Sequence, residues 1–184
     1  MEIDIDQQKI SVGDKYNIFV DGREAYLASR KLFRLFSEIR IRDRANEQIR
    51  YTIKKRWSPF KLFYNIEQCD GSVFEFRSDS VWKLQYYCQV GQDRYEVFGH
   101  KGLRYSIYKN GIQIARLDKN AIVWFKGDKY KIVADKDADA ELLISFCLVV
   151  DDGLYRRGRG IFKWEFGNFG FSGNKVDLSW QPKE

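Results

Sequence analysis

Apolar and polar residues alternate along most of the chain as far as residue 133, as in the Glu-Ile-Arg-Ile-Arg sequence of residues 38–42. This period of two is typical of β-strands that bury one face. Turn-forming or strongly polar residues interrupt the alternation at eleven places and leave twelve strand-like segments. The interruptions are Asp21-Gly22, Arg30-Lys31, Arg44-Ala45-Asn46, Ser58-Pro59, Asp70-Gly71, Ser78-Asp79-Ser80, Gly91-Gln92-Asp93, Gly99-His100-Lys101-Gly102, Asn110-Gly111, Asp118-Lys119-Asn120 and Gly127-Asp128.

Asp-Gly and Asn-Gly pairs between strand-like segments predict tight hairpins, because these residues accept the positive φ that such turns need. Three hairpins look alike: Tyr-Asn-Ile or Tyr-Ser-Ile begins at Tyr16, Tyr64 and Tyr105 and leads each time to a turn glycine. Such a repeat is found in β-propellers, but three units are too few to close one. We therefore expect a meander of hairpins.

The pattern changes after residue 133, where four acids between Asp135 and Glu141 precede a continuous apolar run from Leu142 to Val150, broken by Ser145. Acids at the start and Gly153 after the run favour a helix. A buried strand is the alternative, because several residues of the run are β-branched. A helix that is apolar on every side must lie inside the protein.

These features together predict a mainly β fold, a twelve-stranded antiparallel closed β-barrel around a central hydrophobic helix. A barrel of that size has a lumen that strand side chains alone do not fill, whereas a helix about 10–12 Å across does. We assign residues 1–152 to the barrel, with the helix at about 137–150. Residues 153–184 form a basic and aromatic extension, packed on the barrel or extending from it.

Composition supports one domain, since 44% of the 184 residues are hydrophobic. The chain start lacks a basic and apolar signal pattern, and the longest apolar run is too short to cross a bilayer. We therefore expect a soluble cytoplasmic protein, peripheral to the membrane if it binds lipid. Cys69, Cys88 and Cys147 fit no disulfide framework and are expected in the core.

Basic residues are concentrated in one part of the chain. Of the net charge of +6, residues 23–56 supply a local excess of +7, from eleven Lys and Arg against four acids. Such a surface attracts polyanions, which are nucleic acids or an anionic membrane. The alternative is an ordinary solvated surface.

Alternation places Arg40 and Arg42 on one face of their strand, and Arg50, Lys54 and Arg56 on the corresponding face of the next. A three-residue loop at residues 44–46 would pair Arg40 with Arg50 and Ile41 with Ile49. Like charges that face each other destabilise a sheet, so a bound anion would relieve the repulsion. Glu38 or Glu47 would neutralise part of this face.

Other chemistry is weakly indicated. His100, the single histidine, lies in a predicted turn, where a solvated side chain is expected. Asp135, Asp137 and Asp139 have the spacing of a calcium loop but lack its glycine and closing glutamate, so helix capping is preferred. No nucleotide-binding glycine motif is present. We predict no enzyme activity, no cofactor and no metal site.

The extension carries Arg156, Arg157 and Arg159 and then Trp164 within an alternating aromatic segment. Basic residues beside aromatics are typical of membrane-interface anchors and of platforms that stack nucleic-acid bases. Packing against the barrel is the simpler interpretation.

The order of motifs resembles the LURP-one-related proteins, which belong with the phospholipid scramblases and the tubby C-terminal domain. The resemblance covers about residues 8–152. It is carried by Gly13-Asp14-Lys15-Tyr16-Asn17-Ile18, Asp21-Gly22, the basic hairpins, Tyr105-Ser106-Ile107-Tyr108-Lys109-Asn110-Gly111, Asp139-Ala140-Glu141-Leu142-Leu143-Ile144 and Asp151-Asp152. It implies a twelve-stranded barrel around a central C-terminal helix.

Tubby domains bind phosphoinositide headgroups through Lys and Arg on the barrel exterior, and scramblases are tied to membranes and calcium. Many LURP-one-related proteins have no assigned activity, so the resemblance implies no single one. We expect a non-enzymatic module that binds anionic phospholipids through Arg40, Arg42, Arg50, Lys54 and Arg56. A nucleic-acid-binding protein and a protein-interaction scaffold are the alternatives.

Overall fold

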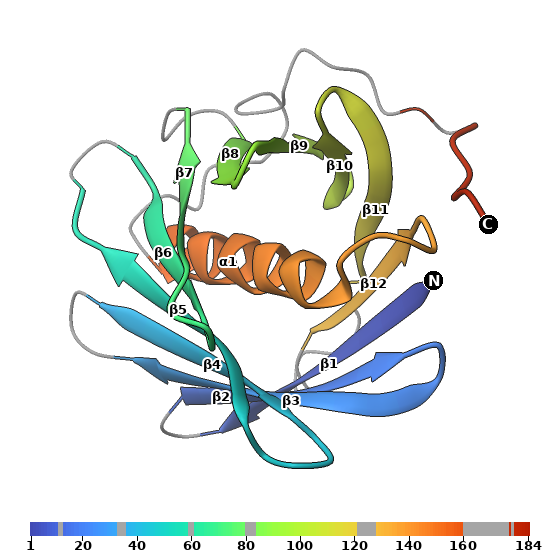
Figure 1. Ribbon diagram of the computed structural model, residues 1–184. Helices are drawn as coiled ribbons and strands as arrows, with labels where there is room; N and C mark the ends of the chain where they lie inside the picture. Colours follow the sequence, from blue (N-terminus) through green and yellow to red (C-terminus); the bar gives the residue numbers. More distant parts are fainter. Residues whose placement is uncertain are drawn as a thin grey trace.

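The structure is a computed structural model that describes residues 1–10, 13–32, 36–58, 61–79, 84–120, 128–159, 177 and 179–184. At residues 9, 10, 32, 120 and 154–159 it describes the backbone alone. Twelve strands and a long helix, α1 (Ala140–Arg159), make up most of these residues (Figure 1). The strands are β1 (Glu2–Ile10), β2 (Gly13–Val20), β3 (Arg23–Leu32), β4 (Ser37–Asp43), β5 (Ile49–Arg56), β6 (Phe63–Gln68), β7 (Val73–Ser78), β8 (Gln85–Val90), β9 (Asp93–His100), β10 (Arg104–Lys109), β11 (Ile112–Asn120) and β12 (Lys129–Ala134).

The twelve strands form one closed antiparallel barrel in which each strand pairs with its neighbours in the sequence. β1 closes the ring by pairing with β12, for example Ile3 with Ile132. α1 runs through the interior (Figure 1). The predicted fold, a closed twelve-stranded barrel around a central helix, is therefore confirmed.

The repeated Tyr-x-Ile motifs lie on β2, β6 and β10, which are evenly spaced around the ring. In all three motifs the tyrosine and the isoleucine are at most 1% exposed. These residues are Tyr16, Ile18, Tyr64, Ile66, Tyr105 and Ile107. The repeat is thus a packing pattern of the barrel interior.

Two of the three Asp-Gly and Asn-Gly turns have the expected backbone, whereas at Asp70-Gly71 only the glycine has a positive φ, of 89°. Asp21 and Gly22 have φ values of 47° and 78°, and Asn110 and Gly111 have values of 51° and 80°. Positive φ at both central residues matches the twist of the strands that such a turn joins. The two hairpin predictions are confirmed.

Several predicted strand boundaries are wrong. Residues 1–20, predicted as one segment, contain both β1 and β2. β2 begins at Gly13, which has a φ of 105°, and a Cβ there would lie 2.1 Å from the carbonyl oxygen of Arg30. Only glycine fits this close approach of two strands.

The predicted break at Arg30-Lys31 is also wrong, because β3 continues through both residues. The Arg30 side chain is 1% exposed, so its charge does not mark a surface turn. Asp118-Lys119-Asn120 likewise lies within β11, and β9 extends to His100. The predicted segment at 121–126 lies outside the described residues.

The apolar run forms the buried part of α1, so the alternative of one more buried strand is excluded. Each residue from Leu142 to Asp152 is at most 2% exposed. Phe146 packs against Phe76 of β7 and Tyr95 of β9, with ring centroids 5.1 and 5.6 Å away. The helix fills the lumen as the barrel argument requires.

The predicted end of the helix near Val150 is wrong, because α1 continues to Arg159. Asp151 and Asp152 stay helical and buried, since partners inside the barrel hold their carboxylates. Gly153 does not cap the helix. A Cβ at this glycine would lie 2.9 Å from Leu62, so the residue allows the helix to pass close to the wall.

At the helix start, the prediction of an acidic cap is confirmed. The Asp139 carboxylate accepts a hydrogen bond from the Leu142 backbone N–H at 3.0 Å.

The end of the chain makes two hydrogen bonds with the rest of the structure. The Asp135 carboxylate accepts one from the Lys183 backbone N–H at 2.7 Å, and the Trp180 indole N–H donates to the Gln113 carbonyl at 3.2 Å. The C-terminal residues 179–184 therefore contact the barrel.

The cysteine prediction is partly confirmed. Cys88 and Cys147 are buried, whereas Cys69 is exposed, and all three are free thiols. Cys69 follows β6 directly, at the start of the turn to β7, which explains its exposure.

The barrel has two distinct ends. At the helix-entry end, where α1 begins, lie the hairpins that follow β2, β4, β6, β8 and β10. At the helix-exit end, Asp152 of α1 contacts Ser37 at the start of β4, and Gly153 lies against Leu62 just before β6. The connections that follow β3, β5, β7 and β9 are at this end.

Phe146→Ala is expected to destabilise the fold by about 3–5 kcal/mol, since it removes a buried aromatic and leaves a cavity. Ile112→Ala is the control, because Ile112 is 58% exposed, and it should cost less than about 0.5 kcal/mol. Urea unfolding followed by circular dichroism measures both. Equal losses would contradict the packing role of α1.

Candidate functional site

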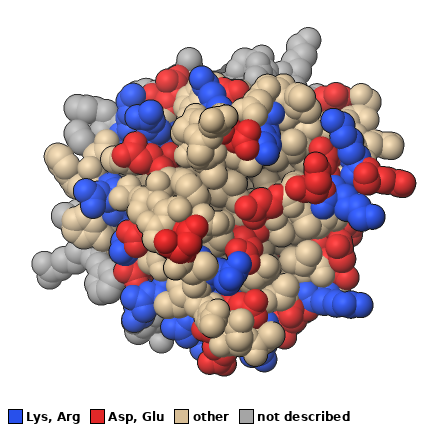
Figure 2. Space-filling model, viewed as in Figure 1, with Lys and Arg blue, Asp and Glu red and all other residues tan. Residues whose placement is uncertain are grey.

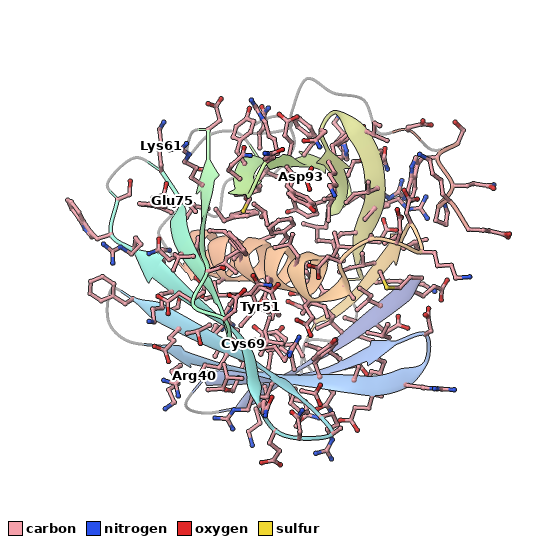
Figure 3. The ribbon with its side chains drawn as sticks, in the orientation of Figure 1. Arg40, Tyr51, Lys61, Cys69, Glu75 and Asp93 are labelled. Atoms are coloured by element: carbon pink, nitrogen blue, oxygen red, sulfur yellow. The ribbon has the colours of Figure 1, made fainter. Side chains whose placement is uncertain are left out.

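The outer face of β4 and β5 carries the basic residues that the sequence singles out. Ile39, Ile41, Tyr51 and Ile53 point into the barrel and are at most 1% exposed. Arg40 therefore lies on the outside, whereas Tyr51 lies inside beside α1 (Figure 3). The prediction of an outward face for Arg40 agrees with this alternation.

The predicted pairing of the two strands is wrong. Arg40 pairs with Thr52 instead of Arg50, and Ile41 pairs with Tyr51. The connection is five residues long, from 44 to 48, and the strands shift register after Ile41. The Asp43 carboxylate accepts hydrogen bonds from the N–H groups of residues 45 and 46 at 2.8 and 3.3 Å, which stabilises this longer loop.

Two cations of this face are paired with carboxylates. Arg40 Nε lies 2.7 Å from Glu38 Oε1, and Lys54 Nζ lies 2.7 Å from Glu67 Oε2. Neutralisation by Glu38 was expected from the sequence, but Glu67 comes from β6 and was not. Arg42 and Arg56 are exposed and form no ion pair with a described residue.

Arg50 does not lie with the other four predicted binding residues. Its Nε donates to Glu141 Oε1 of α1 at 2.9 Å, which raises the pKa of the guanidinium. The Tyr26 hydroxyl donates to the same oxygen at 3.0 Å, and burial together with Glu141 raises the pKa of Tyr26 to about 12. Arg50 thus ties β5 to the start of the helix, and the five predicted residues do not form one cluster.

A second feature lies at the helix-exit end, where large aromatic side chains are exposed. Trp57 is 68% exposed and Phe36 is 48% exposed. They border a groove of about 410 Å³ whose other lining residues are Ser37, Glu38, Lys54, Lys55 and Arg56. We call Phe36, Lys54, Lys55, Arg56 and Trp57 the aromatic rim.

Neither aromatic of the rim, Phe36 or Trp57, was predicted as a binding residue from the sequence. The run Lys54-Lys55-Arg56-Trp57, in which an aromatic directly follows three cations, is the sequence pattern that could have indicated the rim. The Lys55 ammonium lies 5.5 Å from the centre of the Tyr64 ring, which is buried beside it. The rim therefore combines cations with exposed rings at one end of the barrel.

None of the four predicted tail contacts belongs to the residues whose side chains the structure describes. Arg156, Arg157 and Arg159 belong to the last part of α1, where the backbone alone is described. Trp164 lies outside the described residues.

A charged cluster lies inside the barrel, where two consecutive aspartates of α1 meet the wall. We call Asp14, Arg30, Lys119, Asp151 and Asp152 the lumen charge cluster. Arg30 pairs with Asp14 of β2, and its Nη1 lies 3.3 Å from Asp151 and 3.6 Å from Asp152. Lys119 of β11 lies 3.4 Å from Asp151.

Tyrosine and serine hydroxyls complete the coordination of the two aspartates. Tyr16 donates to Asp151 at 2.9 Å, and Tyr130 also donates to Asp151. Asp152 accepts from Ser37 at 2.8 Å and from Tyr64 at 2.7 Å. Through these contacts, α1 is held by side chains of β2, β3, β4, β6, β11 and β12.

The expectation of a solvated His100 is wrong. His100 is 6% exposed at the end of β9, and its Nε2 lies 2.9 Å from Ser106 Oγ on β10. The turn begins only after His100, so the side chain belongs to the strand. The pair joins two neighbouring strands.

A family model described as LURP-one-related matches residues 1–151. The chain belongs to the LURP-one-related family. Neither the curated proteins nor the solved structures contain a match. In this LURP-one-related protein the match spans all twelve strands and α1 as far as Asp151. No helix in the described part of the chain is long and apolar enough to span a membrane.

Arg30→Met should destabilise the protein by about 3–5 kcal/mol, because it leaves three carboxylates buried without their main counterion. Adding Asp14→Asn and Asp152→Asn should restore part of this loss. Arg40→Met, which breaks the exposed pair with Glu38, is the control and should cost less than about 1 kcal/mol. Chemical unfolding at neutral pH tests all three, and equal losses for Arg30 and Arg40 would contradict the role of the cluster.

Alkaline pH should weaken the fold through the lumen tyrosines. Burial and Asp151 raise the pKa of Tyr16 and Tyr130 above 10, so folding favours their protonated forms. That stabilisation is complete below pH 10 and declines above it, by about 1.4 kcal/mol per pH unit for each tyrosine that ionises only on unfolding. Tyr130→Phe should lower stability at neutral pH yet reduce this decline. Unfolding curves recorded between neutral pH and pH 11 give the free energy of unfolding at each pH. The assignment would be contradicted if this free energy declined equally steeply with pH in the wild type and in Tyr130→Phe.

Proposed function

We propose that this protein is a non-enzymatic module that binds anionic phospholipid headgroups at a membrane surface. The binding surface consists of the outer face of β4 and β5, with Arg40, Arg42, Lys54 and Arg56, together with the aromatic rim. The observation that carries the proposal is the exposure of Trp57 and Phe36 beside three consecutive cations. Aromatic rings and basic side chains are both favoured at the level of lipid headgroups.

The charges of this surface suit separate headgroups. Arg42 and Arg56 are available to an anion, whereas Arg40 and Lys54 would exchange Glu38 and Glu67 for a phosphate. Arg binds phosphate oxygens with two parallel hydrogen bonds, and Lys adds a point charge. Each cation near an anionic membrane contributes about 1 kcal/mol.

Nucleic acid is the second candidate, because Trp57 beside three cations would suit base stacking. A nucleic-acid backbone, however, follows a continuous basic track. Glu38 and Glu67 interrupt such a track, and Figure 2 shows acidic and basic side chains interleaved over the viewed face. The interruption favours separate lipid headgroups over a continuous strand.

The double variant Arg42→Gln/Arg56→Gln should weaken binding to phosphatidylserine-containing vesicles about thirtyfold, since it removes two cations. Arg94→Gln/Lys136→Gln is the matched control. It removes the same charge from two exposed residues at the helix-entry end of the barrel. Co-sedimentation with vesicles gives the affinities, and binding should weaken as salt screens the charges.

Glu67→Gln provides a test of opposite sign, because it releases Lys54 and should strengthen binding about fivefold. Equal binding of the wild type to anionic and to neutral phosphatidylcholine vesicles would refute the proposal. So would a preference for short oligonucleotides at equal ionic strength.

A further inference from the structure

The exposed charges of the barrel are distributed unevenly along its axis. At the helix-entry end, the hairpins after β2, β4 and β6 and the segment before α1 carry the exposed acids Asp21, Glu47, Asp70, Asp137 and Asp139, and the exposed cations Arg23, Arg44, Arg94 and Lys136 lie among them. At the helix-exit end, the described exposed residues include the cations Lys31, Arg56, Lys61, Arg77 and Lys101 and one acid, Asp79. An anionic surface would therefore attract the helix-exit end more strongly than the helix-entry end.

Exposed apolar residues follow the same axis. The two large aromatics of the rim, Phe36 and Trp57, lie at the helix-exit end. The exposed Val73 and Ile112 lie at the helix-entry end, and both are aliphatic residues that begin strands after hairpins. Indole and phenyl rings beside cations suit the headgroup region of a bilayer better than isolated aliphatic residues.

The path of α1 adds to this asymmetry. The helix continues from Gly153 to Arg159 at the helix-exit end, and this part of the sequence contains Arg156, Arg157 and Arg159. Cations are favoured in the last turns of a helix, where carbonyl groups give the end a partial negative charge. The chain therefore has three further cationic residues in the part of α1 that leaves the barrel at this end.

We infer that the barrel docks on an anionic membrane end-on, with Trp57 and Phe36 inserted among the headgroups and the helix-entry end directed away. This inference rests on the proposed phospholipid binding and specifies its orientation and its anchors. The basic face of β4 and β5 then contacts headgroups near the rim, through Lys54 and Arg56, more closely than through Arg42.

A fluorescent label at each end of the barrel distinguishes the orientations. Cys69→Ser removes the exposed thiol, and Cys88 and Cys147 are buried. In this background, Trp57→Cys and the control Ile112→Cys each carry a nitrobenzoxadiazole group, whose emission shifts to the blue and brightens in an apolar environment. Ile112 has a similar exposure, 58% against 68%, at the opposite end. We expect the change on phosphatidylserine-containing vesicles at position 57 and none at position 112.

Truncation of the anchors gives a second measurement. Trp57→Ala/Phe36→Ala should weaken binding to the same vesicles at least about tenfold and leave the remaining binding more sensitive to salt. Val73→Ala/Ile112→Ala, which removes exposed apolar residues at the other end, should leave binding unchanged. Far-ultraviolet circular dichroism checks that each variant is folded.

The outcomes separate the two proposals. If the wild type binds anionic vesicles but the label at position 57 does not respond, or responds no more than that at position 112, end-on docking is wrong and phospholipid binding stands. If the wild type does not bind anionic vesicles, the proposed function fails and the orientation with it. A response at position 57 to oligonucleotides but not to vesicles would assign the rim to nucleic acid.

Discussion

The structure depends on the neutralisation of two carboxylates inside the barrel. Asp151 and Asp152 enter the lumen directly after the apolar run of α1, and Arg30 reaches them from the wall. A buried charge without a partner costs several kcal/mol, comparable to the stability of a whole domain. The aspartates therefore allow few positions of α1: a shift along the axis or a rotation would separate them from Arg30, Tyr16 and Tyr64. Apolar packing alone would tolerate such a shift more readily, because it has no direction.

This constraint extends to the surface of the barrel. The Ser37 hydroxyl binds Asp152, and Ser37 directly follows Phe36 in the chain, so one edge of the aromatic rim is attached to the lumen charge cluster. At the other end, Glu141 of α1 binds Arg50 and Tyr26. The helix thus connects both ends of the barrel through polar contacts. The hydrogen bond of Ser37 thereby anchors the chain directly beside Phe36.

The candidate surface was predictable only in part. Alternation placed Arg40 and Arg42 on the outside of β4, because side-chain direction in a strand is a local property. The register between β4 and β5 was not predictable in this way, since it depends on how the Asp43 loop closes. The contact of Arg50 with Glu141 was not predictable either, because the two residues are 91 positions apart in the sequence and no local pattern indicates that they meet. The exposure of Trp57 likewise depends on what the rest of the barrel leaves uncovered.

By itself the sequence determined the hairpins at Asp21-Gly22 and Asn110-Gly111, the alternating strands and the capped helix, because turn geometry and periodicity act over a few residues. The closed barrel followed from the number of strands and from the apolar helix that they must enclose. The sequence did not determine the positions of Arg30, Lys119 and His100, which resemble surface or turn residues but are largely withdrawn from solvent within strands. Only the tertiary structure decided these, because the partners that make a buried charge tolerable come from distant strands. Arg30 and Asp151 are 121 residues apart, and neither position is explained without the other.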